Sequence, residues 1–318
     1  MDRNMSVGFG ERLLEELVRA AQLASPAELP VVLNRYAEAM GLGRAVIYLV
    51  DIQQRLLVPL VESEPELELD TPLAGWAYRT DSLRVEEGPS GGLRVWLPLA
   101  DGAERLGVVE LNMSTLDGLK LRRCRTTALL LALIITSKRT YSDTIAQRMR
   151  TRPMHLPTEM VRAFLPPRSI GTGRVVSTAV LEPAYELGGD TFDHAFTEDV
   201  LHSTILDGMG HNLASGLATS VAIESARQSR RDRPSGEVSL EPGNRILLYS
   251  DGVVESRDEA GEEFGLERFT DYIIRSTAAG QSAPEALRLL IHAILEHRHN
   301  KLSDDATILM FEWQPPDP

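Results

Sequence analysis

Four aspartates stand next to β-rich segments at widely separated points of this 318-residue chain. Asp207 and Asp251 each follow an apolar run and precede a glycine. Asp190 ends a loop that contains two glycines, and Asp304 precedes another apolar run. If these segments are strands that share one sheet edge, the carboxylates converge. Two such charges 4 Å apart repel by about 4 kcal/mol at an effective dielectric constant of 20.

Convergence of these carboxylates requires compensation by cations, by shifted pKa values or by separation. Hard divalent cations are the simplest answer, because Mg²⁺ and Mn²⁺ prefer oxygen ligands. Two such ions can acidify a water molecule and hold a phosphoryl oxygen. The competing interpretation is that Asp-Gly pairs are turns, which we expect for Asp101-Gly102 and Asp117-Gly118.

The elements that position these aspartates follow from hydrophobic periodicity. We expect helices at 11–23 and 27–40, then strands at 44–50, 55–60, 94–99 and 107–112, with a short helix at 73–79 and an acidic loop at 62–70. One long helix is expected over 119–145. In the second half we expect strands at 175–181, 202–206, 245–250 and 308–311, and a helix from Leu213 to about Arg230.

The first half of the chain carries packing motifs of a known sensor fold. They are GLGRAVIYL (41–49), PLAGWA (72–77), WLPL (96–99) and LGVVEL (106–111). With these motifs residues 25–137 resemble a GAF domain, which implies an α/β sensor that binds a small-molecule ligand or only dimerises. All seven histidines lie at or beyond His155, so this region has no histidine for haem. The single thiol, Cys124, stands among arginines and is expected to be an inert helix residue.

The second half carries a longer set of motifs. They are EMVRAFLPP (159–167), EPAYELGGD (182–190), DGMGH (207–211), LYSDGVVE (248–255), EFG (263–265) and DDAT (304–307). Through them residues 158–313 resemble the SpoIIE-like bacterial branch of the metal-dependent PPM protein serine/threonine phosphatases. The resemblance implies a β-sandwich flanked by helices, and therefore an α+β chain. The expected domains are an N-terminal helix (1–24), the GAF-like domain (25–137), a helical linker (138–170) and the phosphatase domain (171–318).

The resemblance also implies roles for individual residues. Asp207 would bridge two Mn²⁺ or Mg²⁺ ions with help from the Gly208 carbonyl, and Asp190 would join one ion's shell. Asp251 and Asp304 would hold the other ion. Asp207 and Asp251 are therefore the expected catalytic residues. Asp305 and His211 would lie in the surrounding shell, orienting a ligand or loop and contacting substrate. Water would attack the phosphorus in line, with no phosphoenzyme.

One part of the family pattern is absent. Residues 228–240 join the helix after Asp207 directly to the strand before Asp251, where the family has further strands and a helix. At usual element lengths the difference is on the order of 60–90 residues. A natural degenerate homologue, an engineered deletion and a segment closed up in the numbering all fit. Asn212 and PGNR (242–245) depart from the family's Gly and Gly-Asp.

Charge and composition limit the partners. The chain has 33 basic and 46 acidic residues, a net charge of −13, which argues against nucleic acid and anionic membranes. Its longest apolar run is 128–135, short of the roughly 20 residues that span a bilayer. The N-terminus is too acidic for a signal peptide, and one cysteine fits a reducing compartment, so we expect a cytoplasmic protein.

The leading hypothesis is a phosphatase that a sensor domain regulates, acting as a homodimer on phosphorylated anti-anti-sigma-like proteins. The alternative is a pseudophosphatase that binds without turnover. A third hypothesis is a metal hydrolase that uses His297 and His299. It is weaker, because side chains two positions apart on a helix point about 200° away from each other around the helix axis.

Overall fold

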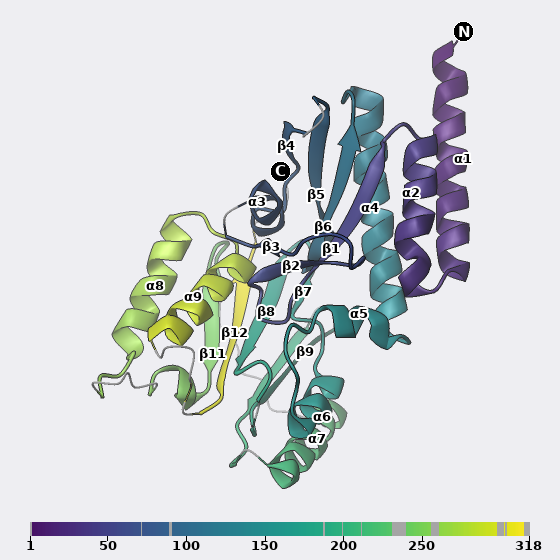
Figure 1. Ribbon diagram of the computed structural model, residues 1–318. Coiled ribbons are helices and arrows are strands. Elements are labelled where there is room, and N and C mark those ends of the chain that lie inside the picture. Colours follow the sequence, from purple (N-terminus) through teal and green to yellow (C-terminus); the bar gives the residue numbers. More distant parts are fainter. Residues whose placement is uncertain are drawn as a thin grey trace. The chain divides into compact units, whose positions relative to one another are not determined.

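The computed structural model describes residues 2–70, 72–88, 91–186, 188–198, 200–210, 212–230, 240–255, 261–297, 302 and 304–314, with side chains from Gly8 onward. The chain divides into two compact units. The first is Met1–Asp101 with Arg105–Thr151, and the second is Gly102–Glu104 with Arg152–Pro318. This division falls inside the predicted linker 138–170. Both units combine helices with runs of consecutive strands that pair in antiparallel sheets, which confirms the predicted α+β class (Figure 1).

The first unit is a six-stranded sheet with helices, in the strand order β3-β2-β1-β6-β5-β4. Its elements are α1 (Asp2–Leu23), η1 (Pro26–Glu28), α2 (Leu29–Ala39), β1 (Arg44–Val50), β2 (Leu56–Pro59), β3 (Leu67–Glu68), α3 (Leu73–Arg79), β4 (Arg84–Glu87), β5 (Leu93–Asp101), β6 (Glu104–Met113), α4 (Gly118–Arg139) and α5 (Asp143–Arg148). The central pair β1 and β6 is antiparallel, with Val46 opposite Glu110.

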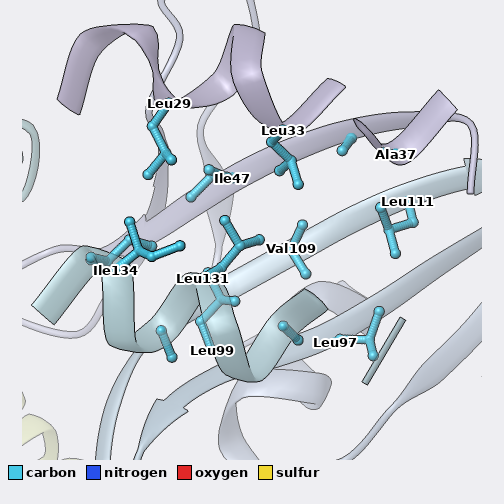
Figure 2. Close-up of a cluster of buried hydrophobic side chains, with 14 of the residues drawn as sticks. Leu29, Leu33, Ala37, Ile47, Leu97, Leu99, Val109, Leu111, Leu131 and Ile134 are labelled. Atoms are coloured by element: carbon cyan, nitrogen blue, oxygen red, sulfur yellow. The ribbon is translucent and has the colours of Figure 1, made fainter. Parts of the chain in front are cut away.

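Helices α1, α2 and α4 cover one face of this sheet. Leu33 of α2 and Leu131 of α4 are fully buried, and they pack with Ile47 and Val109 from the two central strands (Figure 2). Each fully buried leucine of this kind contributes about 1.5–3 kcal/mol. The opposite face carries α3 and a smaller cluster that includes Tyr48 and Trp96. The sheet is thus apolar on the three-helix face and partly polar on the other.

The predicted long helix over 119–145 is wrong. Helix α4 ends at Arg139, and α5 begins separately at Asp143. The break has a local cause, because the Ser142 side chain accepts a hydrogen bond from Thr144 N and starts a new helix. The predicted plain turn at Asp117 is also a helix cap, since its carboxylate accepts from Leu119 N and Lys120 N.

Hydrophobic periodicity did not predict two short strands of the first unit, β3 and β4. The acidic stretch 62–70 was expected to be a loop, but β3 lies within it and pairs with β2. Strand β4 pairs with β5, with Arg84 opposite Trp96. Its sequence RVEE alternates between half-buried and exposed positions and carries only one apolar residue, which lies on the exposed face. A pattern read from apolar residues therefore gives no signal there.

The second unit contains a four-stranded sheet in the order β11-β12-β8-β7 and a two-stranded sheet of β10 and β9. Its elements are α6 (Leu156–Phe164), β7 (Ser169–Gly171), β8 (Val175–Glu182), β9 (Thr191–Thr197), β10 (Val200–Leu206), α7 (Leu213–Gln228), β11 (Arg245–Tyr249), η3 (Asp251–Val253), α8 (Leu266–Ala278), α9 (Ala283–His297) and β12 (Ala306–Trp313).

The two faces of the four-stranded sheet bury different partners. Val180, Ile308 and Met310 pack under α8 and α9. Alternate residues of the same strands, Ala179 and Leu309 among them, pack on the other face against β9 and α6. The β9–β10 pair therefore lies against the four-stranded sheet, as the layers of a small sandwich do.

The predicted absence of a central segment remains a prediction. Within the described ranges α7 is followed by β11, and residues 231–239 between them lie outside those ranges. Strand β11 is an edge of its sheet and exposes Leu248 and Tyr249. In the described part of the chain, no helix has the length and apolar character that crossing a bilayer requires.

Candidate functional site

The loop that carries Asp190 is held by the carboxylate of Asp305. Three successive backbone N–H groups donate to one oxygen, Oδ2 of Asp305. They belong to Gly188, Gly189 and Asp190, at 2.7, 2.8 and 3.1 Å. Asp305 is 3% exposed, so these bonds form away from water. A carboxylate bound by several amides is a strong, charge-assisted anchor. Asp305 therefore fixes the backbone from which Asp190 projects.

The Asp190 side chain is itself buried and hydrogen-bonded. The hydroxyls of Ser250 and Thr307 both donate to its Oδ2 atom, each at 2.7 Å. The same Ser250 hydroxyl accepts from Thr307 N at 3.0 Å, which joins the ends of β11 and β12 to the loop. Burial raises the pKa of Asp190 to about 7. The two hydroxyls oppose this rise, and the charges of Asp207 and Asp305 add to it.

Asp207 reaches the same region through close backbone packing. A Cβ atom on Gly189 would lie 1.6 Å from the carbonyl oxygen of Gly208, so only glycine fits at this position. Thr219 of α7 donates to Gly189 O at 2.7 Å and secures the approach. The loop after β10 and the loop before β9 are thereby locked together beside the start of α7.

The pKa of Asp207 depends on two of the other predicted metal ligands. Loss of surrounding water raises its pKa, and the negative charges of Asp251 and then Asp304 raise it further. Asp251 begins η3, where a Cβ on the next residue, Gly252, would lie 2.0 Å from Asp305 O. The turn after β11 thus rests on the turn before β12. Four aspartates that are far apart in the sequence come together at one end of this unit.

The described residues nevertheless contain no ready-made metal cluster. No group of three or more His, Cys, Asp or Glu side chains among them is arranged to hold a metal ion. Asp207, Asp251 and Asp304 are exposed, and Asp190 is turned to its hydroxyl partners. His211 and His299 lie outside the described residues. His297 is in the last turn of α9 and packs edge-on against Phe264.

Three side chains of this site received no role in the sequence analysis. Ser250 and Thr307 hold the Asp190 carboxylate, and Thr219 holds the Gly189 carbonyl. Ser250 and Thr307 stand inside the quoted motifs LYSDGVVE and DDAT. A hydroxyl within two residues of a strand-end carboxylate is the signal that could have found them. Thr219 is an ordinary position of a small-residue helix and gives no such signal.

Comparison with known proteins gives one family match. The model described as "Stage II sporulation protein E (SpoIIE)" matches residues 228–314, which include Asp251, Asp304 and Asp305 but neither Asp190 nor Asp207. This part of the chain is thus similar to a family of PPM-type phosphatases. No curated protein matches the chain.

Two solved structures resemble part of the chain. One is the GAF domain of a phosphoenolpyruvate-protein phosphotransferase from Coxiella burnetii, at 14% identity and a TM-score of 0.37, covering 42% of this chain and 95% of its own. The other is the GAF domain of the Acinetobacter phosphoenolpyruvate-protein phosphotransferase, at 14% identity and a TM-score of 0.37, covering 45% and 98%.

Proposed function

We propose that this chain is a divalent-metal-dependent phosphoprotein phosphatase whose activity an N-terminal sensor domain controls. The observation that carries the proposal is the anchoring of the Asp190 loop by Asp305, which gathers Asp190, Asp207, Asp251 and Asp304 at one end of the second unit. The SpoIIE match over 228–314 supports the same reaction class.

The donor set suits hard cations. Four carboxylates and the Gly208 carbonyl offer only oxygen ligands, which Mg²⁺ and Mn²⁺ prefer. Burial is the main cause of the raised pKa values of Asp190 and Asp207, and the negative charges of neighbouring aspartates raise both pKa values further. Bound there, two such ions would supply positive charge to the phosphoryl oxygens and acidify a water molecule. We propose Asp207 as the ligand shared by both ions, with Asp190 on one side and Asp251 and Asp304 on the other.

The remaining residues of the site hold the Asp190 carboxylate and its backbone in place. Ser250 and Thr307 orient the Asp190 carboxylate, and Asp305 sets the backbone beneath it. Carboxylates fixed in this way lose little freedom when they bind a cation. The exposed edge of Asp207, Asp251 and Asp304 leaves room for a protein-borne phosphoserine or phosphothreonine. The proposed substrates are small phosphorylated regulators of the anti-anti-sigma type, in the cytoplasm.

The first unit is proposed to be a GAF-like sensor that dimerises through α4. This helix exposes Leu129 and Leu133, one turn apart, to 63% and 55%. An apolar stripe of this kind is typical of a helix that pairs with a second copy. Sedimentation velocity of the full chain should show a dimer, and a doubly substituted Leu129→Glu, Leu133→Glu variant should sediment as a monomer. A wild-type monomer at micromolar concentration would contradict this part of the proposal.

The phosphatase assignment is tested by release of phosphate from a phosphoserine protein with and without Mn²⁺. Asp251→Asn should lose more activity than the roughly 10- to 100-fold that outer-shell substitutions cost. Asp271→Asn, on the exposed surface of α8, removes the same charge away from the site and should keep full activity. Equal rates for wild type and Asp251→Asn would sink the assignment.

A pseudophosphatase is the second candidate, and the absence of a ready-made three-ligand cluster in the described residues favours it. It would bind a phosphoprotein without turnover. Calorimetry with Mn²⁺ separates the two candidates. Two binding events that Asp251→Asn weakens support the enzyme, whereas no heat of binding at millimolar Mn²⁺ supports the pseudophosphatase.

A further inference from the structure

The first unit contains a cavity of about 790 Å³ on the sheet face opposite α1, α2 and α4. Strands β1, β4, β5 and β6 form its floor. Its walls include Glu64, Pro65, Leu67, Pro72 and Leu73 on one side, and Gly88, Gly91, Gly92 and Leu93 on the other. This volume lies within the roughly 300–1,000 Å³ that small-molecule sites occupy. All of its lining residues belong to the first unit, and none of them belongs to the proposed phosphatase site.

A buried carboxylate occupies the middle of the floor. Glu110 is 6% exposed, and its Oε1 accepts a hydrogen bond from Asn112 Nδ2 at 2.7 Å. The same oxygen lies 3.2 Å from Arg94 Nε. The hydroxyl of Tyr48 donates to Oε2 over a long 3.5 Å. Burial and the charges of Glu110 and Glu64 raise the pKa of Tyr48, so the phenol remains a neutral hydrogen-bond donor.

A second carboxylate stands beside the first. Glu86 of β4 accepts from Trp96 Nε1 at 2.9 Å and pairs with Arg94 Nη1 at 3.4 Å. Arg94 thus serves two carboxylates at once. The only other acid–base pair in the lining is Arg44 with Glu64. The lining therefore holds three acids and two bases, and one negative charge is left over.

The hydrogen bonds of the lining, like its net negative charge, favour a positively charged ligand that donates hydrogen bonds. The neutral donors Tyr48, Trp96 and Asn112 all point to the two carboxylates. Glu86 Oε2, by contrast, accepts no hydrogen bond from the described part of the chain. Glu86 is half-buried, and an acceptor with spare capacity there suits a ligand that donates a hydrogen bond. An anion bound here would lie among three carboxylates, and both arginines of the lining are already paired with them.

The walls are of a different character. They are largely apolar and are formed by Pro65, Leu67, Pro72, Leu73 and Leu93. Burial of apolar ligand surface against such walls is favourable, whereas the charged floor demands a compensating positive group. We propose that this cavity binds a small organic cation, a protonated amine joined to an apolar or aromatic body, with the ammonium group at Glu86 and Glu110. This inference deepens the proposed sensor role.

Calorimetry of the full chain with three probes of one shape tests the proposal. The probes are 2-phenylethylamine, phenylacetate and 2-phenylethanol, which are cationic, anionic and neutral. The amine should bind at least tenfold more tightly than the other two. Binding of phenylacetate or phenylethanol as tight as that of the amine overturns the proposal, and so does the absence of any heat with the amine at millimolar concentration.

Two variants locate the amine. Glu110→Gln and Glu86→Gln should each weaken amine binding tenfold or more. The matched control is Glu87→Gln, because Glu87 is the next residue on β4 and is exposed rather than lining the cavity. Should Glu110→Gln fail to fold by circular dichroism, Glu86→Gln decides alone, since Glu86 is 34% exposed and tolerates the change. Equal affinities for Glu86→Gln and Glu87→Gln overturn the proposal. The readout is binding, so an inactive phosphatase site would not affect it.

Discussion

Thr307 donates a hydrogen bond from its hydroxyl to Oδ2 of Asp190 at 2.7 Å, although 117 residues separate the two in the chain. Thr307 is fully buried and Asp190 nearly so. Hydrogen bonds to a charged group contribute about 1.5–3 kcal/mol, more than those between neutral groups. The relationship ties the central strand β12 to the loop that presents Asp190.

Thr307→Val should therefore lower the free energy of unfolding by about 1.5–3 kcal/mol, because it keeps the shape of the side chain but leaves the buried carboxylate short of one donor. Thr307→Ser keeps the hydroxyl and should lose less. Urea titration followed by circular dichroism measures both. A larger loss in the serine variant than in the valine variant would show that the methyl group, not the hydrogen bond, matters here.

Asp304 and Asp305 are adjacent, yet they differ in burial and in hydrogen bonding. Asp305 is buried and accepts three backbone N–H groups, whereas Asp304 is exposed. Asp305→Asn should cost on the order of 2 kcal/mol of stability, since the charge that strengthens three hydrogen bonds is removed.

Asp304→Asn makes the same chemical change on the neighbouring residue and should leave the urea midpoint nearly unchanged. Under the proposed function it should nevertheless weaken Mn²⁺ binding and phosphate release. The pair is measured by urea unfolding and by calorimetry with Mn²⁺. A stability loss at Asp304 as large as that at Asp305 would contradict the assigned division of roles.

The sequence predicted the strands that obey simple periodicity and missed those whose buried residues are polar. Strand β1 was predicted at its observed bounds because RAVIYLV is continuously apolar after its first residue. Strand β9 was missed, because Asp193 and His194 lie in its buried half, at 3% and 2% exposure. Arg227 of α7 and Arg230, just beyond the end of that helix, pair with Asp193, and such compensation from a distant part of the chain is invisible to local pattern analysis.

The candidate site shows the same limit. The four aspartates were found because each stands at a strand end beside glycine or another acid. Their supporting contacts were not, because Ser250 and Asp190 are 60 residues apart and meet only in the folded unit. The break between α4 and α5 was missed for a smaller reason, a single serine cap in an otherwise helical stretch.

Gly189→Ala should disrupt the site, because the added Cβ would lie 1.6 Å from Gly208 O and force the two loops apart. We expect a loss of stability of about 3 kcal/mol, at the upper end of the cost of overpacking. Gly173→Ala is the matched control, since a Cβ there meets nothing within 4 Å. Differential scanning calorimetry of the two variants checks this. A Gly189→Ala protein as stable as Gly173→Ala would refute the close approach of the loops.

His194 is a buried histidine whose protonation state follows from its partners. Its Nε2 atom lies 2.7 Å from Pro167 O, and its Nδ1 atom lies 2.7 Å from Ser177 Oγ. A carbonyl oxygen can only accept, so Nε2 carries the proton. The neutral ring then accepts at Nδ1 from the Ser177 hydroxyl. Burial lowers the pKa of His194 below its ordinary value of 6.5, and Arg230 lowers it further.

A lowered histidine pKa makes the second unit less stable in acid. Between the folded-state pKa and about 6.5 the unfolded chain binds more protons at His194 than the folded one, so the contribution of His194 to stability rises with pH in this window. The raised pKa of Asp190 acts in the opposite direction, but it does so in wild type and variant alike. As the pH is lowered from 7.5 to 5.5, the free energy of unfolding in urea should therefore fall in wild type relative to His194→Gln, whose amide can still donate to Pro167 O, and His202→Gln on β10 should behave as wild type. An unchanged pH dependence in His194→Gln would show that His194 does not cause it.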